Sequence, residues 1–134
     1  MNKRFLDKVV IVTGSGSGIG QTTAERFAEE GAKVIIAELD KSTGKLVEEN
    51  INKKNNQSKF IETDVSDFNS VNDMVNGAIK QFGPPDILIN NAGINVFSEP
   101  LKMSDAEWKR AFSVDLDGVW YGCKAVLPLS LIHI

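Results

Sequence analysis

Thr13-Gly14-Ser15-Gly16-Ser17-Gly18-Ile19-Gly20, residues 13–20, is the stretch that decides the fold. The apolar run at residues 9–13 is typical of a buried strand, and the helix-period segment at residues 19–30 follows the glycines. A glycine-rich turn between a strand and a helix lets backbone N–H groups approach a pyrophosphate at the positive end of the helix. Glycine strings also occur in ordinary turns, since glycine tolerates positive φ. The strand before and the helix after favour a phosphate-binding loop.

The rest of the chain alternates strand-length apolar runs with helix-period segments. We expect further strands at residues 34–38, 59–63 and 86–90. The first helix should bury Ile19, Ala24, Phe27 and Ala28, and Gly31 should end it. One face of the second helix is marked by Leu46, Val47 and Ile51. The third carries Val71, Met74, Val75, Ala78, Ile79 and Phe82 at helical spacing, with Asp67 or Ser66 as its cap.

The fourth helix opens on a capping box, Ser104 to Glu107, and runs on through Val126 with room for a bend. The predicted order is therefore β-α-β-α-β-α-β-α. Strands that are apolar on both faces and separated by helices predict a parallel sheet covered on both sides. We therefore predict an α/β fold: a Rossmann-type, doubly wound parallel sheet that ends after the fourth strand and its helix.

Glu38 ends the second predicted strand, 18 residues beyond Gly20, close to the spacing of a ribose-binding carboxylate. A carboxylate there can accept hydrogen bonds from both ribose hydroxyls of NAD and would repel the additional phosphate of NADP. The loop at residues 13–20 has no Arg or Lys to bind that phosphate. The residues thus predict NAD as the preferred cofactor. The alternative is that Glu38 is only a solvated strand end.

Composition excludes several other classes of function. The 134 residues are 42% hydrophobic and 25% charged, as in an ordinary globular domain, and the net charge of −3 gives no basic footprint for nucleic acid. No apolar run approaches the ~20 residues that span a bilayer, and Asp7 and Lys8 interrupt any secretion signal. The single cysteine, Cys123, cannot form an internal disulfide. We expect a cytoplasmic protein without membrane or nucleic-acid partners, and no metal site.

With Asn90-Asn91-Ala92-Gly93 after the fourth strand, the glycine loop resembles the short-chain dehydrogenase/reductase family over residues 5–128. The resemblance implies NAD-dependent hydride transfer to or from a small alcohol or carbonyl substrate, by a parent protein that is a homo-oligomer. It also implies the strand order 3-2-1-4 and a substrate-pocket wall at residues 94–103. Asp64 and Val65 would lie against the adenine, and the backbone of residues 91–93 would border a ribose while its side chains brace the sheet. The complete predicted cofactor set is Gly14, Ser17, Gly18, Ile19, Gly20, Glu38, Asp64, Val65, Asn91, Ala92 and Gly93.

The sequence departs from the family pattern in its catalytic residues. The family has an Asn in the fourth helix that helps to order a proton-relay water, and this chain has Asp115 there. Ionised Asp accepts hydrogen bonds but cannot donate them, which leaves its relay role open. The family's general acid/base is a Tyr four residues before a Lys, with a Ser upstream. The only Tyr is Tyr121, and residue 125 is Ala, so we interpret Trp120 and Tyr121 as helix-packing residues and expect the chain alone to be inactive.

The final residues, 129–134, fit the family poorly and look like the translation of a transposon-end adapter. On this interpretation residues 1–128 are the NAD-binding half of one domain, and His133 is not native. A simple apolar tail is the alternative. A non-catalytic nucleotide sensor is the rival function, and it requires residues 129–134 to be a genuine C-terminus. A Rossmann methyltransferase is a second rival, against which the Asn-Asn-Ala-Gly turn argues.

The first prediction concerns the gene. We expect it to continue past Pro128 into a strand, then a Ser, then Tyr-x-x-x-Lys within a few dozen codons, because the cofactor half is present without its catalytic residues. Independent genomic sequencing across codon 128 is the test. A stop codon directly after Ile134 would contradict the prediction.

Overall fold

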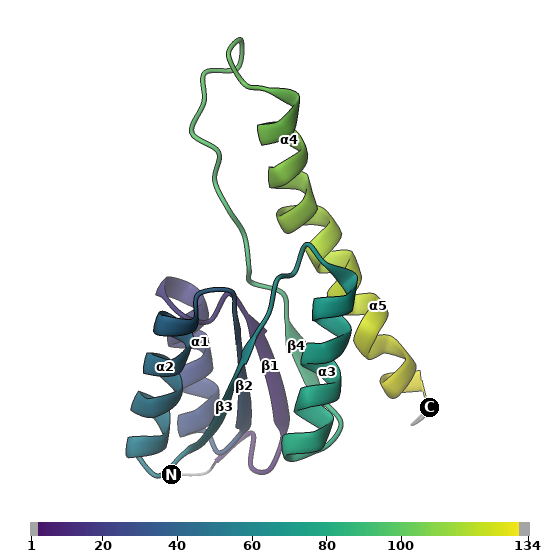
Figure 1. The fold of residues 1–134 in the computed structure, drawn as a ribbon. Helices are drawn as coiled ribbons and strands as arrows, with labels where there is room; N and C mark the ends of the chain where they lie inside the picture. The colour runs from purple at the N-terminus through teal and green to yellow at the C-terminus, as the bar shows by residue number, and fades with distance from the viewer. Residues whose placement is uncertain (1–2, 132–134) are drawn as a thin grey trace.

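A four-stranded parallel sheet forms the centre of the molecule in the computed structural model, which describes residues 3–131 (Figure 1). The strands lie in the order β3-β2-β1-β4, as the family resemblance implied. In the register, Val10 pairs with Val34 on one side and with Ile87 on the other. The strands are β1 (Val9–Thr13), β2 (Lys33–Glu38), β3 (Gln57–Glu62) and β4 (Ile87–Ile89). β3 begins two residues earlier than predicted, and β4 is shorter at both ends.

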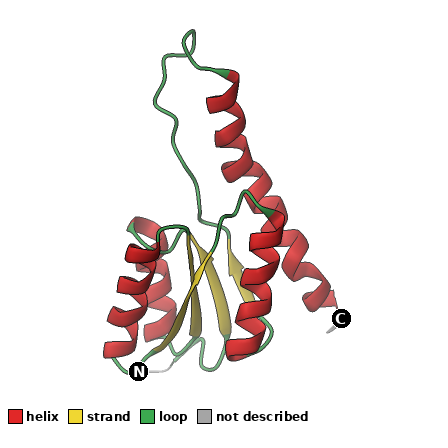
Figure 2. Cartoon of the chain, in the orientation of Figure 1, coloured by secondary structure: helices red, strands yellow, loops and turns green. Residues whose placement is uncertain are grey.

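Helices cover both faces of this sheet, so the predicted doubly wound architecture is confirmed (Figure 2). One face carries α1 (Gly18–Glu29) and α2 (Lys41–Lys53), and the other carries α3 (Phe68–Phe82) and α5 (Gly118–Leu131). A long loop leads from β4 to α4 (Asp105–Phe112), which extends above the sheet. Between α4 and α5 lies a π-helical turn, Ser113–Asp117, inside the segment for which the sequence predicted one helix with room for a bend.

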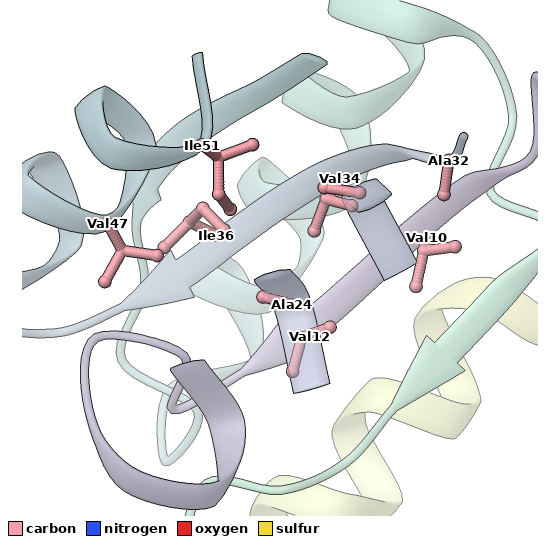
Figure 3. Packing of buried hydrophobic residues seen from close by; sticks show 9 residues of the cluster. Val10, Val12, Ala24, Ala32, Val34, Ile36, Val47 and Ile51 are labelled. Carbon is pink, nitrogen blue, oxygen red and sulfur yellow. The ribbon is translucent and has the colours of Figure 1, made fainter. Parts of the chain in front are cut away.

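Side chains alternate strictly between the two faces of the sheet. Val10, Val12, Val34 and Ile36 point toward α1 and α2, where Val47 and Ile51 meet them (Figure 3). Ile11 and Ile35 point the other way, toward α3 and α5. All five residues of β1 are buried, which is why the run showed no alternation of apolar and polar residues.

The helices begin and end at residues whose side chains or backbone can cap them. Asp67, rather than Ser66, caps α3 by accepting from the backbone N–H of Asn69. The capping box of α4 is complete, because Ser104 accepts from Glu107 N and the Glu107 carboxylate accepts from Ser104 N. The backbone N–H of Ser104, followed by its hydroxyl, donates to the Glu107 carboxylate and lowers the pKa of that carboxyl. Gly83, at a φ of 106°, ends α3 in a conformation that favours glycine.

Three packing predictions were wrong. Ile19 is 81% exposed because the first turn of α1 extends beyond β1 and lies over a cleft. Leu46 is 56% exposed, since α2 packs on the sheet through Val47 and Ile51, and Leu46 lies one helical step of about 100° away from Val47. Trp120 is 62% exposed, whereas its neighbour Tyr121 packs as predicted, with its ring 5.4 Å from that of Phe68.

The predicted tail is helical where the structure describes it. α5 continues to Leu131, and Leu129 packs against the core on the α3 side. Residues 132–134, including His133, lie outside the described residues. Within residues 3–131, no helix combines the length and apolar character needed to span a bilayer.

The second prediction concerns the edge of the sheet. β4 is the last strand of the described sheet, and its side chains Ile87, Leu88 and Ile89 are half-buried. An apolar edge strand is a template for pairing with another chain. We therefore expect the 134-residue chain, expressed alone, to self-associate and to melt without a sharp transition. Sedimentation and thermal unfolding test this, with the protein from the complete gene as the control. A soluble monomer with a cooperative melt would contradict it.

Candidate functional site

The candidate site is a cleft of about 390 Å³ at the carboxyl ends of the four strands. After β1 the chain turns one way toward β2 and β3, and β4 lies on the opposite side of β1. This is the topological switch point of the sheet, where open α/β sheets bind their ligands. The residues that line the cleft are Gly14, Ser17, Gly18, Ile19, Gly20, Glu38, Leu39, Thr63, Asp64, Val65, Asn91, Ala92, Gly93 and Ile94.

The glycine loop and the turn after β4 touch through their backbones. A Cβ added at Gly14, whose φ is +63°, would lie 2.8 Å from the Cα of Ala92. A Cβ at Gly20 would overlap the carbonyl oxygen of Gly14 and the amide nitrogen of the Asn91 side chain. Only glycine fits at these two positions, so the contact between the two turns depends on both.

Asn91 and Thr13 hold the two turns together by hydrogen bonds. The Asn91 side-chain Nδ2 donates to the carbonyl oxygens of Thr13 (3.0 Å) and Gly14 (3.1 Å). The Thr13 hydroxyl oxygen accepts from the backbone N–H groups of Asn91 and Ala92, both at 3.0 Å. Asn91 thus braces the ends of β1 and β4, as the family resemblance implied.

The mouth of the glycine loop is shaped for a negatively charged group. Gly18 has a φ of +54°, and no atom lies within 4 Å of where its Cβ would stand. The Ser17 side chain, at the N-cap of α1, makes no capping hydrogen bond, and α1 has no acidic residue in its first turn. The first N–H groups of a helix carry partial positive charge and lack partners within the helix. This open loop therefore fits a pyrophosphate.

Glu38 lies at the other side of the loop, and three backbone donors hold its carboxylate. Its Oε2 accepts from Gly16 N (2.9 Å), and its Oε1 accepts from the N–H groups of Leu39 (2.8 Å) and Asp40 (3.2 Å). Among the described residues that line the cleft there is no Lys or Arg. The Glu38 carboxylate is thus fixed at the rim of a cleft whose only lining charges are acidic.

Asp64 and Val65 form the wall of the cleft after β3. The Asp64 carboxylate accepts from the backbone N–H (2.9 Å) and hydroxyl (2.6 Å) of Ser66. The hydroxyl of Ser70 accepts from Asp64 N at 2.9 Å. Val65 packs so closely on Gly118 that a Cβ there would lie 2.9 Å from Val65 Cγ2. The wall is therefore fixed both to α3 and to the start of α5.

Asp115 lies in the π-helical turn and contacts the loop that leaves the site. Its Oδ1 accepts from the backbone N–H of Ile94 at 2.8 Å. The same oxygen is 3.4 Å from where a Cβ of Gly93 would stand. π-Helical turns inside helices occur frequently at functional sites. Asp115 thus joins the α4–α5 helix to the end of the Asn-Asn-Ala-Gly turn.

Every predicted cofactor residue lines the cleft, although four sequence segments supply them. Asp115 contacts its rim. Sequence reasoning missed Thr13, Gly16, Leu39 and Thr63, and it placed Ile94 in the wall of the substrate pocket rather than in the cofactor set. Thr13 had a signal, since it is a hydroxyl residue at the end of an otherwise apolar strand. Gly16 had none, because its partner, Glu38, lies 22 residues away in the sequence. The described residues contain no cluster of His, Cys, Asp and Glu that could hold a metal ion.

The fold and this cleft define a Rossmann-type protein with a glycine-rich loop at the switch point of the sheet. The model of the short chain dehydrogenase family matches residues 8–132. The chain therefore belongs to the short-chain dehydrogenase family.

Two curated relatives illustrate the similarity. An uncharacterized oxidoreductase of Thermotoga maritima is 42% identical over 115 residues, which cover 83% of this chain and 43% of the relative. The meso-2,3-butanediol dehydrogenase of Serratia marcescens is 38% identical over 125 residues, covering 93% of this chain and 49% of the enzyme. The chain thus spans about half the length of the curated relatives it matches.

Solved structures agree with this assignment. A short-chain dehydrogenase/reductase from Burkholderia phymatum in complex with NAD matches with a TM-score of 0.90 and 30% identity, over 92% of this chain and 44% of that one. A hydroxysteroid dehydrogenase from Escherichia coli gives a TM-score of 0.89 and 29% identity, over 95% of this chain and 54% of that one.

The third prediction tests the hydrogen bonds that join the ends of β1 and β4. Replacing Thr13, which is 2% exposed, by Val should leave the Asn91 and Ala92 N–H groups without their acceptor. Leaving a fully buried donor unsatisfied costs about 1–3 kcal/mol, and because these two hydrogen bonds are part-buried we expect a total loss at the lower end of that range. Thr13→Ser keeps the hydroxyl and is the control. Urea unfolding of the protein from the complete gene should show the loss in Thr13→Val only, and equal stability of the two variants would contradict the assigned role.

Proposed function

We propose that this chain is the cofactor-binding half of an NAD-dependent oxidoreductase that interconverts a small-molecule alcohol and its carbonyl compound. One observation carries the proposal: the open glycine loop and the fixed Glu38 carboxylate lie in a single cleft at the switch point of the sheet. The first suits a pyrophosphate and the second suits a ribose diol. NAD contains both groups.

The residues of the cleft divide between the parts of the dinucleotide. Gly18, Ile19 and Gly20 would hold the pyrophosphate through backbone N–H groups at the start of α1. Glu38 would accept from the hydroxyls of the adenine ribose, and Asp64 and Val65 would border the adenine. A partly apolar wall beside an acceptor group suits an adenine ring with its exocyclic amine.

The turn after β4 would serve the reactive end of the cofactor. NAD, when bound, accepts or supplies the hydride. The backbone of residues 91–93 would border the second ribose, and its position is fixed by Thr13 on one side and by Asp115 on the other. We propose that Asp115 acts first as a positioning residue, because its Oδ1 is already used to hold Ile94 N. Whether its carboxylate also belongs to the proton relay stays a prediction.

We assign substrate contacts and acid–base chemistry to residues outside the cofactor cleft. The loop at residues 94–103 would form one wall of the substrate pocket. The exposed Phe97 ring and the exposed Leu101 side chain suit contact with an organic substrate. The Ser and the Tyr-x-x-x-Lys pair are expected beyond this chain, whose relatives are about twice its length. A cytoplasmic location and a homo-oligomeric parent stay predictions.

The fourth prediction concerns cofactor choice. The protein from the complete gene should prefer NAD to NADP, because the Glu38 carboxylate would face the 2′-phosphate of NADP without a lysine or arginine lining the described cleft. Like charges opposed in this way cost several kcal/mol. Glu38→Arg should erode the preference. The measurement is kcat/KM for both cofactors over a panel of alcohols and carbonyl compounds.

Two outcomes of that measurement would count against the proposal. Equal kcat/KM for NAD and NADP in the unmutated protein would contradict the role of Glu38. Binding of NAD without turnover of any substrate in the panel would favour the non-catalytic nucleotide sensor.

A further inference from the structure

Asp115 places a carboxylate beside the turn that follows β4, at a position where the family pattern has a neutral Asn. Its Oδ1 accepts from the backbone N–H of Ile94 at 2.8 Å, and the same oxygen is 3.4 Å from where a Cβ of Gly93 would stand. Gly93 and Ile94 both line the cleft. An asparagine could accept the same hydrogen bond through its own Oδ1, so this contact does not require a charge.

No cation among the described residues neutralises this carboxylate. Within residues 3–131, Asp115 forms no ion pair with a lysine or arginine. Its side chain is exposed, and Ile94 N is the only donor that it binds in that part of the chain. The described lining of the cleft also contains no lysine or arginine. Ionised Asp115 therefore keeps its negative charge at the rim of the cleft.

The topology indicates which end of a dinucleotide would lie near Asp115. Glu38 ends β2, where a carboxylate takes the adenine ribose, and the glycine loop after β1 takes the pyrophosphate. β4 lies on the other side of β1 from β2. A dinucleotide that crosses these strand ends must extend its second nucleotide toward β4 and the turn at residues 91–93. The nicotinamide half would therefore be the half that lies on the Asp115 side.

The two redox forms of the cofactor differ in charge at this end of the molecule. The nicotinamide ring of NAD carries a positive charge, which the ring of NADH lacks, whereas the adenosine and the pyrophosphate are the same in both. A nearby carboxylate attracts a cation. Glu38 and Asp64 would lie at the adenosine half, so their charges should act nearly equally on both forms. Asp115 is the acidic residue placed to distinguish them.

We infer that Asp115 is a specificity determinant for the redox state of the cofactor, because its charge strengthens the binding of NAD relative to that of NADH. This inference rests on the proposed function. The overall reaction, in which an alcohol and NAD give a carbonyl compound, NADH and one proton, keeps its equilibrium constant. What changes is the balance between the two bound forms of the cofactor, which shifts toward NAD and so favours loading of the protein for alcohol oxidation.

Asp115→Asn is the decisive variant, because it removes the charge and keeps an oxygen that can accept from Ile94 N. Asp117→Asn is the matched control. It removes an equal charge from the same π-helical turn, and the Asp117 side chain has no hydrogen bond or ion pair within the described part of the chain.

The dissociation constants of NAD, by calorimetry, and of NADH, by fluorescence, are measured with the protein from the complete gene over a series of NaCl concentrations. 5′-AMP, which has no nicotinamide, reports whether the adenosine half of the cleft is intact.

The ratio of the NADH to the NAD dissociation constant should fall about two- to fivefold in Asp115→Asn, the size of one partly screened charge pair. It should change less in Asp117→Asn, and 5′-AMP should bind all three proteins equally. In the unmutated protein the ratio should also fall as NaCl rises, because salt screens the charge while the pyrophosphate contributes equally to both forms. A purely structural role of Asp115 would produce neither effect.

The outcomes distinguish the inference from the proposed function. An unchanged ratio in Asp115→Asn, with 5′-AMP binding intact, would show that the charge is neutralised by another group and would overturn the inference while NAD binding stands. An equal shift in Asp117→Asn would overturn it too, since the position of the charge would then not matter. If Asp115→Asn does not fold, the salt series on the unmutated protein decides, and a ratio independent of NaCl overturns the inference. Failure of the unmutated protein to bind either NAD or NADH would overturn the proposed function as well.

Discussion

The close contact between two backbone turns, one after β1 and one after β4, is the constraint on which the site depends. These turns leave neighbouring parallel strands and must diverge, since one continues into α1 and the other into the long loop toward α4. Gly14 and Gly20 allow them to touch, and the Asn91 amide joins them. The floor of the cleft is therefore made of main chain rather than side chains. Its shape consequently varies little with rotamer choice, which suits the recognition of a cofactor by its phosphates.

The fold could be predicted from the sequence because its strongest signals are local. β1 and β2 are apolar on both faces, and α3 repeats its apolar residues with helical spacing; both patterns follow from burial within a few neighbouring residues. The errors, at Ile19, Leu46 and Trp120, concern side chains whose burial depends on the position of a helix over the sheet. Helical periodicity locates an apolar face, but it does not tell where a helix extends beyond the layer it covers.

Prediction of the site succeeded for side chains that follow a strand and failed for backbone hydrogen-bond donors. Glu38 and Asn91 could be identified because each follows a strand, and the ends of parallel strands meet at one edge of the sheet. The donors that fix Glu38 could not be identified from the sequence, because they are backbone N–H groups, which every residue except proline carries. Gly16 looked like one more glycine in a loop rich in them. Only the folded chain, which brings residues 16 and 38 together, shows that its N–H has a partner.

The π-helical turn at Ser113–Asp117 has a consequence for how the chain tolerates change in length. Such a turn accommodates one residue more than an α-helical turn, and one residue corresponds to about 100° of rotation around the helix axis. Deleting a single residue there would restore α-helical winding and leave α4 in roughly the same rotation relative to α5, because the wide turn absorbs the additional residue. The side chains within the turn would change direction instead, and Asp115 Oδ1 would no longer face Ile94 N. A length change that an ordinary surface helix absorbs at its frayed end is here felt at the rim of the cleft.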